Sequence, residues 1–139
     1  MSPSLLDLDE RRFPRPLLDA IGFREILEVD RQAGAVAAVY EAGMAFTHSD
    51  GAIVQGGIAA AWIDNAMALA VAARERDTMV ATLEMKLSWL GAVTIGRHVV
   101  RARVLKWGRT VVFLEASLGS EADVLVRASS TGRLFPSRQ

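Results

Sequence analysis

Asp64 is the residue whose type and position point most directly to chemistry. It is the only ionisable residue in residues 51–73, a stretch that is otherwise apolar or small apart from Gln55 and Asn65. A carboxylate in such surroundings must be paired, hydrogen-bonded or protonated, because burying an isolated charge is costly. Held in this way, it suits a general base or a nucleophile. The structural alternative is a side chain that faces a solvent channel or caps neighbouring backbone.

Two glycines precede Asp64 at the expected start of the same helix. The backbone N–H groups of Gly56 and Gly57 would have no partner inside the helix and would lie at the positive end of its dipole. They could therefore hold a developing oxyanion, and glycine would let a substrate carbonyl approach closely. The alternative is that the pair only relieves strain at a tight entry to the helix.

Polar side chains next to these glycines supply further candidates. Ser49 and Gln55 could orient a water molecule or a substrate carbonyl, whereas Asp50 is better explained by turn chemistry. His48 lies in the same polar loop. Thr82, on the following strand, could hydrogen-bond a carboxylate or a water, although an ordinary strand threonine is the commoner case.

These side chains must be positioned by a helix and several strands. Ala, Met and Leu are frequent in residues 56–74, which predicts a helix, and this helix is apolar on nearly every side. A short helix is expected at 17–21, closed by Gly22, and a loop at 44–54. The predicted strands are 23–30, 35–40, 82–89, 97–106, 110–118 and 124–133. A helix that is apolar all round needs a sheet curled about it, which is an α+β arrangement.

The strand at 82–89 alternates in polarity, which predicts one apolar and one polar face. The side chains expected on the apolar face are those of Leu83, Met85, Leu87 and Trp89. Those expected on the polar face are Thr82, Glu84, Lys86 and Ser88.

Length and composition limit the classes of protein. The 139 residues predict one domain, 1–139, with an irregular segment at 1–22 that contains the short helix. Sixteen acidic residues balance sixteen basic ones, and no basic block indicates nucleic-acid binding. The absence of cysteine excludes disulfides, thiolate metal sites and a cysteine nucleophile. With only two histidines, neither a metal site nor a cofactor is expected.

Hydropathy raises the questions of membrane insertion and of assembly. Residues 51–73 are long enough to span a bilayer, but an Asp near the centre costs roughly 2.5–3.5 kcal/mol on insertion scales. A buried core helix is therefore predicted, with no membrane partner. Residues 1–15 lack the apolar core of a signal peptide, and a cytoplasmic location is expected. The positive mean hydropathy, +0.23, indicates apolar surface buried between subunits of a homo-oligomer.

Taken together, the segment His48-Ser49-Asp50-Gly51-Ala52-Ile53-Val54-Gln55-Gly56-Gly57-Ile58-Ala59-Ala60-Ala61-Trp62-Ile63-Asp64-Asn65 resembles the PaaI-like group of hotdog-fold thioesterases. That family has a polar residue, a short Gly-containing loop, His-Gly-Gly, and an Asp on the helix about seven residues later. Trp107-Gly108-Arg109-Thr110 also resembles a hairpin of the family. The resemblance covers roughly residues 23–133.

The resemblance implies a hotdog fold, an antiparallel sheet curled around one long helix, and hydrolysis of an acyl-CoA. It implies that Asp64 is the nucleophile or general base, that the Gly56 N–H polarises the thioester carbonyl, and that Thr82 helps to position the water. Gln55 and Ser49 complete the expected catalytic set. The residues expected to bind substrate are His48, Gly57, Asn65 and Arg109.

Family members form this site between two subunits. The resemblance therefore implies that Asp64 of one chain faces Gly56 of another, in a dimer or a dimer of dimers. Two positions depart from the family's pattern. Gln55 replaces the histidine before the two glycines, and Ser49 replaces an expected Asn or Gln. Gln can donate a hydrogen bond but cannot titrate, and losing one oxyanion-type contact can cost ~10²–10³ in rate.

Two other functions on the same fold stay open. One is hydration or dehydration of an acyl thioester, for which His48 and Asp64 would be the catalytic pair. The Pro-rich run that such enzymes carry between these two residues is absent here. The other is a non-catalytic acyl-CoA-binding protein, which the departures at Gln55 and Ser49 suggest.

The acyl group and the contacts to CoA are not fixed by the sequence. Four apolar side chains could line an aromatic or medium-chain pocket or belong to the core: Phe46, Trp62, Met67 and Trp89. Four basic side chains could meet the phosphates of CoA or form a solvated strand face: Arg101, Arg103, Lys106 and Arg109.

Overall fold

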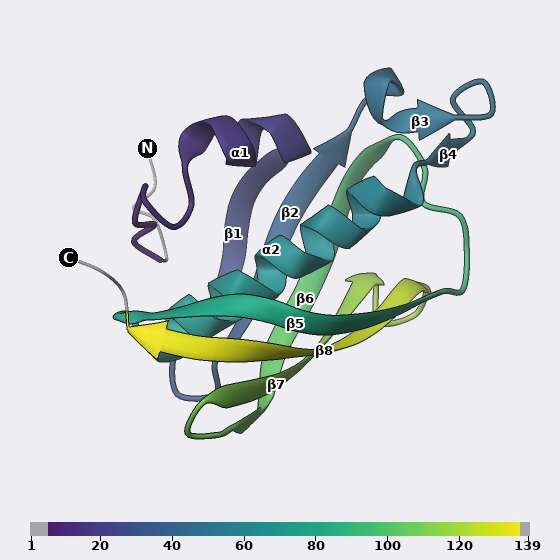
Figure 1. The fold of residues 1–139 in the computed structure, drawn as a ribbon. Coiled ribbons are helices and arrows are strands. Elements are labelled where there is room, and N and C mark those ends of the chain that lie inside the picture. Colours follow the sequence, from purple (N-terminus) through teal and green to yellow (C-terminus); the bar gives the residue numbers. More distant parts are fainter. Residues whose placement is uncertain (1–5, 137–139) are drawn as a thin grey trace.

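A six-stranded antiparallel sheet and one long helix make up the computed structural model, which describes residues 6–136 (Figure 1). The sheet strands are β1 (Phe23–Asp30), β2 (Ala35–Ala42), β5 (Thr78–Trp89), β6 (Gly96–Trp107), β7 (Val111–Gly119) and β8 (Val124–Pro136). Their order across the sheet is β1-β2-β6-β7-β8-β5. The remaining elements are α1 (Arg15–Ile21), the 3₁₀ turn η1 (Met44–Phe46), β3 (Thr47–His48), β4 (Ile53–Val54) and α2 (Gly56–Arg74). The α+β prediction is confirmed.

Helix α2 lies across one face of the sheet, which curls around it (Figure 1). It contacts strands β1, β2, β5, β6 and β7, and ten of its 19 residues are buried. Its length and hydropathy would suffice to cross a membrane, yet it packs against the sheet as the central core helix. Its bounds agree with the prediction from the sequence.

A stack of aromatic rings anchors the first half of α2. The Trp62 ring is fully buried between Tyr40 and His98, with ring centroids 5.7 and 5.9 Å away. Its Nε1 donates a 2.5 Å hydrogen bond to the carbonyl oxygen of Ile21, at the end of α1. Gly22 follows with φ +80° and closes α1, as the sequence predicted. This packing fixes the helix segment that carries Asp64.

Strand β5 departs from the predicted alternation at Thr82. Thr82 pairs with Gly132, while Glu84 pairs with Thr131, so Leu83 is the extra residue of a β-bulge. A bulge shifts the alternation of side chains by one residue. The prediction that Thr82 shares a face with Glu84, Lys86 and Ser88 is therefore wrong, because Thr82 turns toward α2.

The ends of several strands also differ from the prediction. β5 begins at Thr78 rather than at residue 82, and β8 runs on to Pro136. These two extensions pair with each other, from Thr78 with Pro136 to Val80 with Leu134. The loop predicted at 44–54 contains η1 and the short β3–β4 hairpin, which lies beside the start of α2 (Figure 1).

Candidate active site

The Asp64 carboxylate is held by one side chain from the sheet. The Thr82 hydroxyl donates a 2.5 Å hydrogen bond to Asp64 Oδ1. Asp64 is half-buried on the third turn of α2, and Thr82 lies on β5 immediately before the bulge. Within residues 6–136, Oδ2 has no hydrogen-bond partner. One oxygen is therefore fixed and the other is free to act on a substrate or a water.

Asn65, the next residue, is tied to the core instead. The Tyr40 hydroxyl donates a 2.6 Å hydrogen bond to Asn65 Oδ1. Burial raises the pKa of Tyr40, so its phenol stays protonated and acts as a donor. The Asn65 oxygen is thus occupied from the core side, and only its amide nitrogen is left for the substrate contact that the sequence predicted. The contact that Tyr40 makes with the site was not predicted from the sequence. The one feature that could have indicated it is a lone tyrosine in a strand of small and aliphatic residues.

The start of α2 presents two free backbone donors. The carbonyl oxygen of Gln55 accepts the N–H groups of Ile58 and Ala59, at 2.9 and 3.3 Å. The N–H groups of Gly56 and Gly57 have no acceptor among residues 6–136, as expected for the first turn of a helix. Gln55 makes no side-chain cap to the helix, so its amide is also available.

Trp89 lies directly against this helix start. A Cβ added to Gly56 would be 3.3 Å from Cζ2 of the Trp89 indole, whereas a Cβ on Gly57 would meet nothing within 4 Å. The Trp89 side chain is 45% exposed. Trp62 and Met67, by contrast, are buried core residues and cannot line a surface pocket. Only Phe46 and Trp89 remain as the aromatic neighbours of the helix start.

The polar loop before the helix is shaped by turn geometry. Ser49 and Asp50 both have left-handed backbone angles, with φ of +56° and +57°, and Gly51 follows with φ +87°. His48 Nδ1 and Ser49 Oγ lie 2.9 Å apart. Asp50 therefore has the turn role that the sequence favoured, and Ser49 is engaged with its neighbour His48.

One chain does not bring all the predicted site residues together. The structure joins Asp64 with Thr82, and Gly56 with Trp89. Gly56 and Asp64, however, are eight residues apart on one helix, which separates them by about 12 Å along its axis. A single thioester carbonyl cannot touch the Gly56 N–H and the Asp64 carboxylate of the same chain.

The basic candidates lie away from Asp64. Arg101 and Arg103 are on the sheet face opposite α2 and pair with Glu28 and Glu115. Arg109 is in the β6–β7 turn, two residues after Trp107. Trp107 lies under the Arg74 guanidinium, at the end of α2 far from Gly56. The predicted contact between Arg109 and substrate therefore cannot come from the helix start of the same chain.

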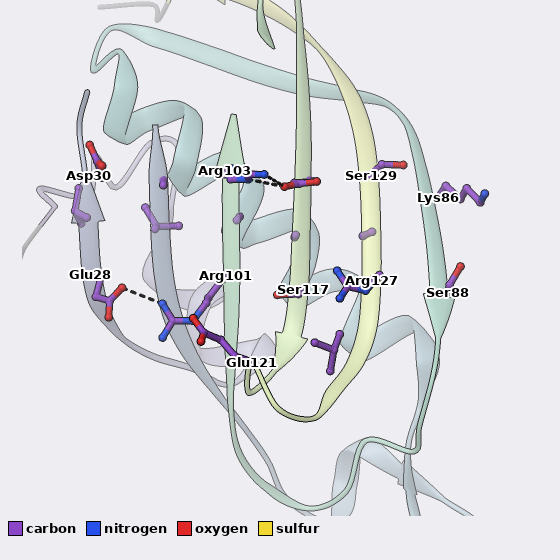
Figure 2. Close-up of a pocket in the computed structure, with 18 residues that line it drawn as sticks. Glu28, Asp30, Lys86, Ser88, Arg101, Arg103, Ser117, Glu121, Arg127 and Ser129 are labelled. Atoms are coloured by element: carbon purple, nitrogen blue, oxygen red, sulfur yellow. Dashed lines mark hydrogen bonds and ion pairs between the residues drawn. The ribbon is translucent and has the colours of Figure 1, made fainter. Parts of the chain in front are cut away.

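Two further observations concern ligands. In the part of the chain from 6 to 136, no three His, Asp or Glu side chains gather in a way that would hold a metal ion. A groove of about 810 Å³ lies on the outer face of the sheet, between charged side chains of β1, β5, β6, β7 and β8 (Figure 2). This groove is separated from Asp64 by the sheet itself.

A family model for the thioesterase superfamily matches residues 51–126. The chain belongs to the thioesterase superfamily. The matched segment contains Gly56, Gly57, Asp64 and Thr82, the residues whose geometry is described above. No curated protein matches the chain.

This thioesterase-superfamily chain is also similar to several solved structures. A phenylacetic acid degradation-related protein from Ralstonia eutropha JMP134, described as a thioesterase, is 30% identical, with a TM-score of 0.77 over 86% of this chain and 89% of that one. The PaaI protein of the E. coli phenylacetic acid degradation operon is 12% identical, with a TM-score of 0.78 over 90% and 88%. A Streptococcus mutans protein bound to acetyl-CoA is 17% identical, with a TM-score of 0.73 over 84% and 91%.

The predicted resemblance to PaaI-like hotdog thioesterases is confirmed by these matches. The predicted fold, a curled antiparallel sheet around one long helix, is confirmed as well. Together they support thioester hydrolysis as the general activity of the chain.

Proposed function

We propose that this protein hydrolyses an acyl-CoA to a free acid and CoA, with Asp64 at the reacting carbon. The observation that carries the proposal is the 2.5 Å hydrogen bond from Thr82 to Asp64, the only acidic residue of the largely apolar helix α2. The Thr82 hydroxyl fixes the orientation of the carboxylate through Oδ1 and leaves Oδ2 without a partner among the described residues. A catalytic base or nucleophile needs one positioned, uncommitted oxygen of this kind.

In the general-base form of the reaction, Oδ2 takes a proton from water as the water oxygen bonds to the thioester carbon. The carbonyl oxygen becomes an oxyanion, which then reforms the carbonyl as the C–S bond breaks. The proton on Asp64 passes to the leaving CoA thiolate. In the nucleophilic form, Oδ2 attacks the carbon directly, CoA thiolate leaves, and water hydrolyses the resulting acyl-Asp64 anhydride. Both forms need a donor that stabilises the oxyanion.

The free N–H of Gly56 is the proposed oxyanion donor, with Gly57 beside it. Because one helix holds Gly56 and Asp64 about 12 Å apart, the donor must come from a second chain. Strand β5 offers a route to that assembly. It pairs with β8 on one side only and ends the sheet, and an open edge of twelve residues is a template for pairing with another chain. We propose a dimer that pairs two β5 edges and places the two helices side by side.

The remaining predicted residues lie at this helix start, on the third turn of α2 and beyond its far end. Gln55 has an uncommitted amide that can donate to the thioester carbonyl, in the place of the family's histidine. His48 and Ser49 lie on the adjacent hairpin and are proposed to border the acyl-CoA. Asn65 contributes its amide nitrogen. Arg109 is proposed to reach CoA phosphate only across a subunit boundary, because it lies at the other end of α2.

Acyl-CoA is the proposed ligand class because of the superfamily match and the acetyl-CoA complex of the Streptococcus mutans protein. A cytoplasmic location stays a prediction. The hydratase alternative needs His48 as a catalytic partner of Asp64. No observation favours it, since the His48 ring lies 2.9 Å from the Ser49 hydroxyl.

The test is thiol release from a panel of aliphatic and aryl acyl-CoAs by the wild type and by Asp64→Asn and Asp64→Ala. We expect both variants to lose at least about 10²-fold in kcat. Asp50→Asn is the matched control, because Asp50 lies in the turn, and it should keep wild-type kcat. An Asp64 variant as fast as the wild type would exclude the proposal.

Two companion measurements separate the alternatives. Crotonyl-CoA hydration without thiol release would indicate the hydratase, and tight CoA binding with no turnover over the whole panel would indicate the non-catalytic binder. Single turnover in ¹⁸O-water distinguishes the two forms of hydrolysis. An ¹⁸O-labelled Asp64 with an unlabelled free acid after one turnover identifies nucleophilic Asp64, with water attacking the anhydride at Cγ of Asp64, whereas a general base puts the ¹⁸O into the free acid and never labels the protein.

A further inference from the structure

Trp89 ends strand β5 on the side of the sheet that carries α2. Met85 and Leu87, at the alternate positions before it, pack against the core. The Trp89 side chain is instead 45% exposed and lies beside the start of the helix. The row of β5 side chains on this side of the sheet therefore ends in an aromatic ring that meets both the helix and the solvent.

Trp89 differs from Trp62, the other tryptophan in the first half of the structure around α2. Trp62 is fully buried, and its indole N–H donates to the carbonyl oxygen of Ile21. The indole N–H of Trp89 has no acceptor among residues 6–136. Trp62 is thus an anchor of the fold, whereas nearly half of the Trp89 side chain is open to a ligand.

The Trp89 ring presents its face, rather than its edge, to Gly56. A Cβ added to Gly56 would be 3.3 Å from Cζ2 of Trp89 and 3.7 Å from both Cε2 and Cη2, the two carbons bonded to Cζ2. A point in the plane of the ring, outside Cζ2, would be much further from those two carbons than from Cζ2. The Cβ position therefore lies above the ring, and the indole face covers one side of the helix start.

The proposed oxyanion donor lies beside this indole face. A carbonyl oxygen that accepts the Gly56 N–H lies about 2.9 Å from the Gly56 nitrogen, so the rest of the thioester group comes next to the ring. A thioester group is flat, and a flat group makes the most contact with an aromatic ring when it lies against the face of the ring. Attack on a carbonyl carbon comes from above or below its plane. In the proposed dimer, Asp64 of the other chain therefore acts on the thioester face that the indole leaves open.

We propose that Trp89 is a specificity-determining residue that selects acyl groups without a branch at the α-carbon, an inference that rests on the proposed hydrolysis at Gly56 and Asp64. At a branched α-carbon, the two carbon substituents cannot both lie in the plane of the thioester. At least one of them points either into the indole face or into the side from which Asp64 or its water attacks. Straight-chain acyl groups, and unsaturated ones that are flat at the α-carbon, avoid both clashes.

The experiment compares thiol release from butyryl-CoA and isobutyryl-CoA, two isomers that differ only in the α-branch. We expect the ratio of their kcat/KM values to fall about 10-fold or more in Trp89→Ala and in Trp89→Leu, because both variants remove the flat face. Trp89→Phe keeps a flat ring and should keep most of the wild-type ratio. Trp107→Ala is the matched control, because Trp107 is an indole at the far end of α2, and it should keep the ratio. The intrinsic reactivities of the two thioesters are the same in every assay, so a changed ratio reports the protein alone.

Far-UV circular dichroism shows which variants are folded, and the leucine and phenylalanine variants carry the comparison if the alanine variant does not fold. Thiol release from butyryl-CoA with the same ratio in the wild type and in the alanine or leucine variant would overturn the role of Trp89 but leave the proposed function standing. An equal fall of the ratio in the Trp107 control would also overturn it. No thiol release by the wild type from any thioester would instead overturn the proposed function, and this inference with it.

Discussion

The Tyr40 hydroxyl donates a 2.6 Å hydrogen bond to Oδ1 of Asn65, the residue that follows Asp64 on α2. Tyr40 is fully buried and stacks on Trp62. The helix segment that carries the candidate carboxylate is thus attached to β2 by a polar contact inside an apolar core. Buried polar contacts of this kind are costly to leave unpaired, so they fix one arrangement of the elements that they join.

A titration can test the burial of this hydroxyl directly, because Tyr40 is the only tyrosine in the chain. Burial raises the pKa of Tyr40 above that of the unfolded chain, which is about 10. Above pH 10 the unfolded chain loses a proton that the folded chain keeps, so the free energy of unfolding falls as pH rises, by up to about 1.4 kcal/mol per pH unit. Below pH 10 this contribution is constant. We expect tyrosinate absorbance at 295 nm to appear only as the protein unfolds.

Tyr40→Phe is the companion variant for that titration. It should unfold more readily at pH 7, by about 1–3 kcal/mol, because Asn65 loses its donor. Its unfolding free energy should fall less steeply above pH 10 than that of the wild type. Tyrosinate absorbance in the folded wild-type protein near pH 10 would contradict the assignment.

The Thr82 hydroxyl is expected to matter through Asp64. Thr82→Val keeps the shape of the side chain but removes the donor, and hydrogen bonds to charged groups contribute about 1.5–3 kcal/mol. We expect thiol release to fall about 10–100-fold in kcat, with a smaller change in KM. Thr82→Ser keeps the hydroxyl and should stay within a few-fold of the wild type. Equal rates for the valine and serine variants would show that the hydroxyl has no catalytic role.

The two helix-start glycines should respond differently to alanine. At Gly57 a methyl group meets nothing within 4 Å, so Gly57→Ala should raise the unfolding free energy by up to about 1 kcal/mol. At Gly56 the methyl group would press on the Trp89 indole at 3.3 Å and displace it or the helix start. If the Gly56 N–H is the oxyanion donor, Gly56→Ala should lower kcat about 10²-fold. Thiol release and chemical denaturation are measured on both variants. Full activity of Gly56→Ala would contradict the proposed role of Gly56 as the oxyanion donor.

The β-bulge at Leu83 can be tested from the opposite strand. A Cβ at Gly132, which pairs with Thr82, would clash with Cγ2 of Val80. Gly132→Ala should therefore cost about 1–3 kcal/mol in urea denaturation through overpacking. Gly43→Ala, where nothing lies within 4 Å, is the control and should stay within about 0.5 kcal/mol. Equal midpoints for the two variants would contradict the packing described for β5 and β8.

Local patterns in the sequence were sufficient for much of the fold. The run of Ala, Met and Leu predicted α2 with its observed bounds, because a helix that is apolar on all sides has a strong compositional signal. The strands predicted at 23–30 and 35–40 likewise correspond to β1 and β2, which pair with each other. The face on which Thr82 lies was not predictable. It depends on a bulge at Leu83, opposite Gly132 and Thr131, and Gly132 is 50 residues from Thr82 in the chain.

The candidate site was predictable in residue type more than in arrangement. Asp64 stands out by charge alone, but its partner Thr82 was placed on the wrong face. Trp62 and Met67 resemble pocket residues in the sequence, since burial in a core and in a ligand pocket favours the same side chains. The contact between Trp89 and Gly56 has no local signal, because it joins two segments 33 residues apart.

Because α2 is a continuous helix, an insertion between its first turn and Asp64 would change the geometry of the candidate site. The continuous helix from Gly56 to Arg74 fixes the distance between the proposed donor at its start and the acid on its third turn. Inserting one residue between Gly57 and Asp64 would rotate the carboxylate by about 100° around the helix axis. It would also lengthen the distance along the axis by about 1.5 Å. In the proposed dimer, each site takes its donor from one α2 helix and its acid from the other. The insertion would be present in both helices, so both sites would be misaligned at once.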